Sequence, residues 1–262
     1  MPSVLTGAAL ANRELIYLGV SGDGDSASIG LGQFAHVLRR GVDMVYIVEN
    51  NGVYDLTKGQ FSATADKGSK SKRGATNNDE PIDLVLLALA LGATFVARGF
   101  SGDKTQLVPL IKAAVAHRGA AFIDVISPCV AFNNHAGSTK SYDYVREHND
   151  AVNRLDFWPS RDEITTEIAP GATRDVLLHD GGTVRLHKLR DDYDPSDKVA
   201  AMSYLESRRA RGEVVTGLLY VKPDSADMHD ALETVDAPLN ALSDADLVPG
   251  SVALAALNAS LR

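Results

Sequence analysis

The 262-residue sequence has little of several features that mark other protein classes. It contains one cysteine, so no disulfide can form within the chain. Acidic residues outnumber basic ones by 34 to 26, and the net charge of -8 argues against nucleic-acid binding as the main task. No apolar run approaches the roughly 20 residues that cross a bilayer, and the first residues lack the basic start of a signal peptide. We therefore predict a cytoplasmic protein that binds neither membranes nor nucleic acid.

Two common catalytic signatures are also missing. The sequence has no Gly-x-Ser-x-Gly elbow for a serine nucleophile and no paired cysteines for a zinc site. Its apolar content of 45% and charged content of 23% are those of an ordinary globular protein.

Short apolar runs alternate with segments of helical periodicity along the first half of the chain. This order predicts an α/β fold with a parallel sheet covered by helices on both faces. The predicted strands are residues 15–20, 44–48, 93–97 and 121–126. The predicted helices are residues 26–40, 82–91 (opened by Pro81) and 104–117, with a further helix near the N-terminus.

The second half has weaker patterns and is predicted to be a small C-terminal extension. We divide the chain into an α/β domain, residues 1–150, and an extension, residues 151–262. In the extension the sequence predicts a hairpin over 175–189 around the turn at Asp180. The acidic tail from Pro223 is expected to be an extended arm that packs on a partner chain. The remaining predicted elements are helices over 142–155 and 199–209 and a strand over 214–221.

Two polar motifs follow the first two predicted strands. Asp23, between Gly22 and Gly24, ends the first strand, and Asn51 ends the second, 28 positions later. Ligands of parallel sheets bind beyond the carboxyl ends of the strands, so these residues should converge. A carboxylate, an amide oxygen and the carbonyl of Val53 suit Mg²⁺, which substrate phosphates usually complete. The alternative is that Asp23 caps the following helix and Asn51 only forms a turn.

The motifs resemble a known family. Gly22-Asp23-Gly24 with Asn50-Asn51 resembles the thiamine diphosphate motif, and the run 51–60, Asn-Gly-Val-Tyr-Asp-Leu-Thr-Lys-Gly-Gln, is similar to the β subunit of 2-oxoacid:ferredoxin oxidoreductases. The resemblance implies a thiamine diphosphate-binding fold with Mg²⁺ on Asp23, Asn51 and Val53. It implies cofactor binding by Gly22, Asp23, Gly24, Asp25, Asn51, Val53, Leu56 and Thr57; Asp25 is alternatively a helix cap.

The same resemblance implies a reaction and partners. These enzymes decarboxylate a 2-oxoacid oxidatively to acyl-CoA and CO2 and pass the electrons to ferredoxin. The pattern at 56–60 favours 2-oxoglutarate or a broad range of 2-oxoacids, with an α subunit completing the site. Lys58 is expected to meet the substrate carboxylate, although a solvated loop lysine is equally consistent with its charge. Asp55 stands where the family has glycine, and its carboxylate would repel an anionic substrate.

The sequence also departs from the family. Cys129 matches one ligand of a [4Fe–4S] cluster, which normally takes four thiolates, but no other cysteine is present. An earlier strand and helix, expected ahead of the strand that leads to Gly22, are also absent. We therefore interpret Met1 as an internal methionine, which reflects either a start assigned too late or a truncated chain. Two alternatives stay open: a non-catalytic remnant or assembly subunit, and a non-oxidative thiamine diphosphate-dependent decarboxylase or synthase.

Two further features have a functional and an ordinary interpretation. The cations Lys67, Lys70, Lys72 and Arg73 suit the phosphates of coenzyme A or a distal substrate carboxylate, but such runs are more often solvated surface. His135, after Asn133-Asn134, follows Cys129 closely, and we interpret it as an ordinary hydrogen-bonded histidine.

Overall fold

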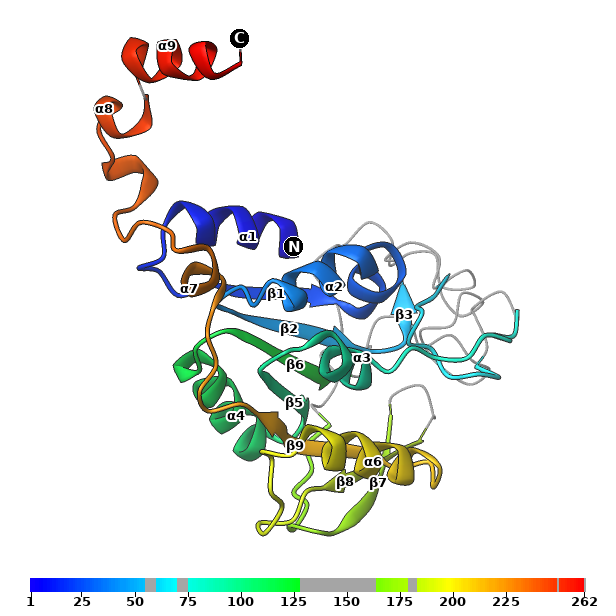
Figure 1. The fold of residues 1–262 in the computed structure, drawn as a ribbon. Coiled ribbons are helices and arrows are strands. Elements are labelled where there is room, and N and C mark those ends of the chain that lie inside the picture. Colours follow the sequence, from blue (N-terminus) through cyan, green and yellow to red (C-terminus); the bar gives the residue numbers. More distant parts are fainter. Residues whose placement is uncertain (55–59, 70–74, 128–163, 179–182, 249, 262) are drawn as a thin grey trace, which may run out of the picture.

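The sheet organises the fold (Figure 1). The computed structural model describes residues 1–54, 60–69, 75–127, 164–178, 183–248 and 250–261. Within them, seven strands form one sheet in the order β1-β2-β6-β5-β9-β8-β7, and β3 pairs with β4 separately. The bounds are β1 Leu18–Gly22, β2 Met44–Asn50, β3 Val53–Tyr54, β4 Gln60–Phe61, β5 Phe95–Phe100, β6 Ala120–Ile126, β7 Thr173–Leu177, β8 Thr183–Lys188 and β9 Val214–Val221.

The first four strands of the sheet order are parallel. β1, β2, β6 and β5 pair in parallel, β9 is antiparallel to β5, β8 is parallel to β9, and β7 closes the far edge antiparallel to β8. The predicted α/β class is confirmed, with an antiparallel junction at β5–β9 that the sequence analysis did not predict.

Helices cover both faces, as predicted. One face packs against α1, α2, α3 and α6, whereas α4 covers the other. The helical bounds are α1 Pro2–Ala11, the π-helix η1 Gly24–Ile29, α2 Leu31–Arg39, α3 Leu84–Leu91, α4 Lys104–Ala116, α6 Lys198–Arg209, α7 Met228–Leu232, the 3-10 helix η3 Leu239–Ala241, α8 Asp244–Leu247 and α9 Gly250–Ser260.

Successive side chains of the central strands point to opposite faces of the sheet, and this explains why two hydrophobic cores form. In β2, Val45 and Ile47 point to the α4 side, whereas Tyr46 and Val48 join the larger core on the opposite face. There, Phe34 of α2 packs edge-on against Phe122 of β6, with ring centroids 5.1 Å apart. Because both faces are covered, these strands are apolar almost throughout.

Two predicted boundaries shift for identifiable reasons. The helix expected from residue 82 begins at Leu84, because Asp83 caps it by accepting hydrogen bonds from the N–H groups of Val85 and Leu86. The strand expected over 93–97 starts at Phe95 and continues to Phe100. It continues because its one charged residue, Arg98, is paired with the buried Asp124 and the partly buried Asp83.

The C-terminal region extends the same sheet. The predicted hairpin is confirmed as β7 and β8, the predicted helix as α6 and the predicted strand as β9. The predicted boundary at 150 and the helix over 142–155 lie outside the described residues. Within the described residues, no helix is long and apolar enough to cross a membrane; the cytoplasmic location stays a prediction.

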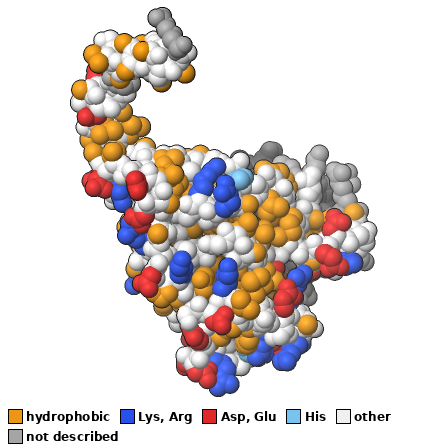
Figure 2. Space-filling view, in the orientation of Figure 1, with side chains coloured by type: hydrophobic (Ala, Val, Ile, Leu, Met, Phe, Trp, Pro, Cys, Tyr) orange, Lys and Arg blue, Asp and Glu red, His pale blue; other side chains and the backbone are white. Residues whose placement is uncertain are grey.

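The tail from Pro223 is an arm built of short helices. α8 and α9 project away from the sheet (Figure 1), and neither contains a buried residue. Hydrophobic side chains are exposed along this segment (Figure 2). They include Leu247, Val252, Leu254 and Leu257. Packing of this arm on a partner stays a prediction.

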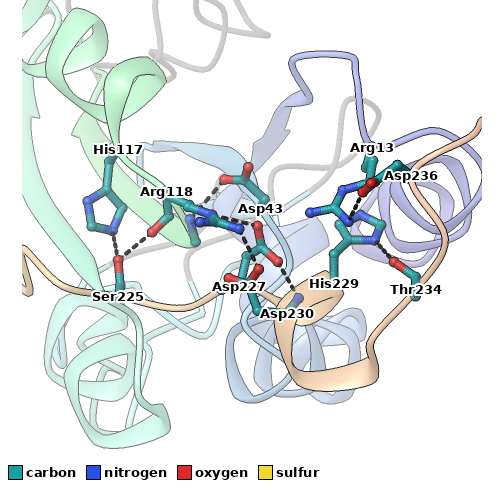
Figure 3. A network of polar contacts seen from close by, with 11 residues as sticks. Arg13, Asp43, His117, Arg118, Ser225, Asp227, His229, Asp230, Thr234 and Asp236 are labelled. Carbon is teal, nitrogen blue, oxygen red and sulfur yellow. Dashed lines mark hydrogen bonds and ion pairs between the residues drawn. The ribbon is translucent and has the colours of Figure 1, made fainter.

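A polar clasp ties the start of the tail to the amino end of the sheet (Figure 3). Arg118, just before β6, donates to Asp227 at 3.0 Å and also to Asp230. Arg13 donates to Asp236 at 2.8 Å, and the backbone N–H of Gly119 donates to Asp43. A small polar cavity of about 170 Å³ lies among these residues. Since Arg118 is paired with two carboxylates, we interpret the cluster as structural.

A buried histidine of β8 connects β7 to α6. His187 of β8 is 1% exposed, and its ring nitrogens contact the hydroxyls of Thr173 at 2.8 Å and Tyr204 at 2.9 Å. Burial lowers the pKa of His187, and the positive charge of Arg208 lowers it further. The folded state therefore binds fewer protons than the unfolded state in mildly acidic solution.

We predict that the protein loses stability as the pH falls below about 6.5, the pKa of an unperturbed histidine, towards the lower folded pKa. His187→Gln should make this loss smaller, because the unfolded chain then has one fewer proton to gain. Thermal unfolding of both proteins at pH 7.5 and 5.5 tests this. His36→Gln, at an exposed position of α2, controls for the loss of any histidine. An identical acid sensitivity in wild type and His187→Gln would contradict the prediction.

Candidate functional site

Asp23 and Asn51 lie at the carboxyl ends of two neighbouring parallel strands. Asp23 follows β1 and Asn51 follows β2, and the register pairs Gly22 with Glu49. The side-chain oxygens of Asp23 accept from the backbone N–H of Asn51 at 3.5 Å and from that of Gly52 at 3.1 Å. The two motifs therefore meet, as their positions in the sequence predict.

Asp23 does not act as a helix cap. It is the residue ahead of η1, but its side chain makes no capping bond to that helix. It is 1% exposed and points instead at the Asn51–Gly52 turn, where the hydroxyl of Thr64 also donates to it. The capping alternative for Asp23 is wrong.

The turn after β2 is shaped by Asn51 and Gly52. The side-chain oxygen of Asn51 accepts the N–H of Val53 at 2.9 Å, an Asx turn. Gly52 has a φ of 73°, which a residue with a side chain rarely adopts. The turn role of Asn51 is thus real, and it directs two N–H groups at Asp23.

The unusual feature of this site is that the carboxylate of Asp23 is buried. Burying a carboxylate is costly unless a positive charge or several hydrogen bonds compensate it. Among the residues that the structure describes, no Lys or Arg forms an ion pair with Asp23, so three hydrogen bonds carry this task. An ionised carboxylate has about four acceptor sites, and among the described residues Oδ1 accepts only the long bond from Asn51.

The chemistry of the donors suits a hard cation. Asp23, the amide oxygen of Asn51 and the carbonyl of Val53 are all oxygen ligands, which Mg²⁺ prefers. In the described part of the chain, no group of three or more His, Cys, Asp and Glu could hold a metal. A cation here would accordingly need further oxygens from a bound phosphate or from water.

The glycines on either side of Asp23 differ in their surroundings. A Cβ on Gly22 would be 3.8 Å from the carboxylate of the exposed Asp25, so there is room beside it. A Cβ on Gly24 would lie 2.1 Å from the ring of Tyr54. The space beside Gly24 is thus filled by Tyr54 of β3, and glycine is required there for close packing.

The helix after the motif begins as a wide π-helical turn. The hydroxyl of Ser26 in η1 donates to the carbonyl of Gly22 and bonds the hydroxyl of Tyr46, both at 2.8 Å. A Cβ on Gly30 would come within 2.2 Å of the Asp25 carbonyl, so glycine is needed where η1 passes into α2. Single π-turns inside helices are frequent at functional sites.

Several predicted site residues lie outside the described residues. They are Asp55, Leu56, Thr57, Lys58, Lys70, Lys72, Arg73, Cys129 and His135. Of the predicted basic cluster only Lys67 is described, and its ammonium pairs with Glu80 at 2.6 Å at the surface. Lys67 thus matches the solvated interpretation.

A row of charged side chains that was not predicted from the sequence lies beside the site. Arg98 of β5 donates to Asp124 of β6 at 2.7 Å and to Asp83 at 2.7 Å. Asp124 in turn accepts from the side-chain amide of Asn50 at 3.1 Å. The available signal was a charged residue within each of two apolar strands, where charges are rarely buried unless paired.

Burial and pairing act in opposite directions on these acids. Burial raises the pKa of Asp124 above its usual value, and the bonds from Arg98 and Asn50 offset only part of this. Burial acts in the same direction on Asp83. There, Arg98 and two backbone N–H groups of α3 outweigh it and hold the pKa below its usual value.

We predict that Gly24→Ala destabilises the protein by about 1–3 kcal/mol, the usual range for an overpacked site, because Tyr54 must move. Gly32→Ala is the matched control, since it meets open space in α2. Alanine there should stabilise the helix by up to about 1 kcal/mol. Urea unfolding of both variants measures the difference; equal stability of Gly24→Ala and wild type would contradict the packing described.

Comparison with known proteins places this geometry in a family context. Residues 1–125 match the family model of the thiamine pyrophosphate enzyme C-terminal TPP binding domain. A 2-oxoacid:ferredoxin oxidoreductase subunit beta from Saccharolobus solfataricus is 43% identical over 159 residues, covering 60% of this chain and 50% of the relative. The 2-oxoglutarate oxidoreductase subunit KorB of Mycobacterium tuberculosis is 40% identical over 134 residues, which are 51% of this chain and 36% of the relative.

A solved structure agrees with these relatives. The 2-oxoglutarate:ferredoxin oxidoreductase from Magnetococcus marinus, with 2-oxoglutarate, coenzyme A and succinyl-CoA bound, matches with a TM-score of 0.65 and 28% identity. The match covers 97% of this chain and 72% of that chain. The chain spans about half the length of the β-subunit relatives from Sulfolobus and Saccharolobus solfataricus. The resemblance to 2-oxoacid:ferredoxin oxidoreductase β subunits is confirmed, and residues 1–125 match the TPP-binding domain of thiamine pyrophosphate enzymes.

Proposed function

We propose that the chain is the thiamine diphosphate-binding β subunit of a 2-oxoacid:ferredoxin oxidoreductase. The observation that carries the proposal is the buried carboxylate of Asp23, which faces the Asn51–Gly52 turn at the ends of two parallel strands. This arrangement lies within the segment that matches the TPP-binding family model. A cation bound there would balance a charge that, among the described residues, only hydrogen bonds compensate.

The residues around Asp23 fit a Mg²⁺–diphosphate group. Asp23, the side-chain oxygen of Asn51 and the carbonyl of Val53 would hold the metal, as the resemblance implies. Binding would require Asn51 to share the oxygen that now accepts the N–H of Val53. An added Cβ on Gly22 would meet only ordinary contact, with the Asp25 carboxylate at 3.8 Å, and this is the side from which we propose that a phosphate approaches. Gly24, Asp25, Leu56 and Thr57 complete the cofactor site that we propose.

The chain's own contribution to the reaction is binding and orientation. Thiamine diphosphate, when bound, supplies a carbon nucleophile for the 2-oxo carbon of a substrate that then loses CO2. Asp23 and Asn51 would fix the diphosphate end and so the position of the reactive ring. We propose that Lys58 orients the substrate by pairing with its carboxylate.

The relatives suggest the substrate and the partners. Because several are named for 2-oxoglutarate, we propose that this 2-oxoacid is oxidised to an acyl-CoA and CO2. An α subunit is the expected partner, and coenzyme A and ferredoxin are the expected acyl and electron acceptors. The given sequence supplies one thiolate, Cys129, for a [4Fe–4S] cluster that normally takes four.

We predict that thiamine diphosphate binds with a saturable, Mg²⁺-dependent heat signal when titrated into the chain, alone or co-expressed with a candidate α subunit. Asp23→Asn keeps the shape but loses the charge and should weaken binding by about 100-fold, the upper range for changes around a metal site. Glu49→Gln is the control, because this exposed acid lies near the site but outside the proposed ligand set. If neither format binds the cofactor, the proposed function is wrong.

A second prediction concerns the assembled complex. With coenzyme A present, ferredoxin reduction should be faster with 2-oxoglutarate than with pyruvate at equal concentrations, as the names of the relatives suggest. Cofactor binding without ferredoxin reduction by any 2-oxoacid would favour a non-catalytic subunit. CO2 release without ferredoxin reduction would instead indicate a non-oxidative decarboxylase.

A further inference from the structure

Two buried charged residues, Arg98 and Asp124, connect to the half-buried Asn50, which directly precedes Asn51. Asn50, Asp124 and Arg98 lie on β2, β6 and β5, three neighbouring parallel strands. The register pairs Asp124 with Val48 on one side and with Arg98 on the other. Asn50 is two residues beyond Val48 and so faces the same side of the sheet. We call these three residues the Asn50 brace.

Two hydrogen bonds hold Asn50, one from within the brace and one from Ser127. The side-chain amide of Asn50 donates to Oδ1 of Asp124 at 3.1 Å, and its backbone carbonyl accepts the N–H of Ser127 at 2.8 Å. Both contacts come from β6 or the residue after it. The next two residues, Asn51 and Gly52, aim their N–H groups at Asp23. The position of Asn50 therefore fixes where the turn begins relative to the carboxylate.

The other end of the brace is anchored by a helix. Arg98 uses Nε for Asp124 and Nη2 for Asp83, each at 2.7 Å. Asp83 also caps α3 through two backbone N–H groups. One continuous line of contacts thus runs from the first turn of α3 across β5 and β6 to β2, and through the turn to Asp23.

A contribution to folding stability is not a sufficient reason for burying the ion pair of Arg98 and Asp124. Asp124 is fully buried, and well-packed apolar residues often replace a buried ion pair without loss of stability. Such replacements would leave Asn50 without its side-chain partner at the one point where the chain enters the turn. A network with directional bonds defines that point more precisely than apolar packing does.

We propose that Arg98, Asp124 and Asn50 are positioning residues that set the geometry of the Asn51–Gly52 turn against Asp23, and through it the affinity for Mg²⁺ and diphosphate. This inference rests on the proposed function. The brace touches neither metal nor cofactor; it acts by holding the backbone from which two of the proposed ligands, Asn51 and Val53, extend.

The test uses the full chain in the format in which wild type binds thiamine diphosphate. Asn50→Ala removes the amide–carboxylate bond at a half-buried strand end. We expect the affinity for thiamine diphosphate to fall about tenfold, as for the loss of one hydrogen bond to a charged group. The Mg²⁺ concentration for half-maximal binding should rise with it. Calorimetric titration gives both values, and thermal unfolding without ligand gives the stability.

Two further variants separate positioning from general destabilisation. Arg208→Met breaks the ion pair between Arg208 of α6 and Glu213, which directly precedes β9. It should lower stability and leave cofactor affinity unchanged. Asp124→Asn should also weaken cofactor binding. The double variant Asp124→Asn, Asn50→Ala should bind no more weakly than the poorer single variant, because the two residues act through the same hydrogen bond.

The outcomes are distinct. Wild-type affinity in Asn50→Ala would overturn the brace while leaving the proposed function intact. A loss of affinity in Arg208→Met equal to that in Asn50→Ala would also overturn it, since any destabilisation would then have the same effect. Absence of binding by wild type in both formats would overturn the proposed function and the brace with it.

Discussion

The buried carboxylate of Asp23 is the constraint on which the rest of this site depends. Its charge lies at the junction of β1 and β2, and the described residues compensate it with hydrogen bonds from Asn51, Gly52 and Thr64 rather than with a cation. To supply those donors, the chain after β2 must turn at once. The left-handed conformation of Gly52 and the Asx turn of Asn51 meet that need.

Polar side chains concentrate at the two opposite ends of the sheet and serve different purposes there. At the carboxyl ends, Arg98, Asp124 and Asn50 connect α3 to the turn beside Asp23. At the amino ends, Arg118 binds the two acids that start the tail, and the segment beyond leaves the body of the molecule. The first network lies beside the candidate site, whereas the second fixes the path of the chain away from the sheet.

Much of the site could be predicted because its information is local. Gly22-Asp23-Gly24 and Asn50-Asn51 each follow an apolar strand, and a single crossover helix between two strands implies parallel neighbours. The sequence could not decide whether Asp23 caps η1 or faces Asn51, since both use the same carboxylate. Nor could it predict that the ring of Tyr54 covers Gly24, because that contact depends on how β3 folds back over η1.

The sequence by itself determined the α/β class, the order of strands and helices in the first half, and the meeting of Asp23 with Asn51. These follow from periodicity and from the rule that parallel strands end at one edge. Only the tertiary structure decided the antiparallel entry of β9 beside β5 and the partners of Arg98. Such contacts join residues distant in the chain, and a buried charge in an apolar strand reveals that a partner exists without revealing which one. The choice among Asp83, Asp124 and every other acid was made by the packing of the sheet.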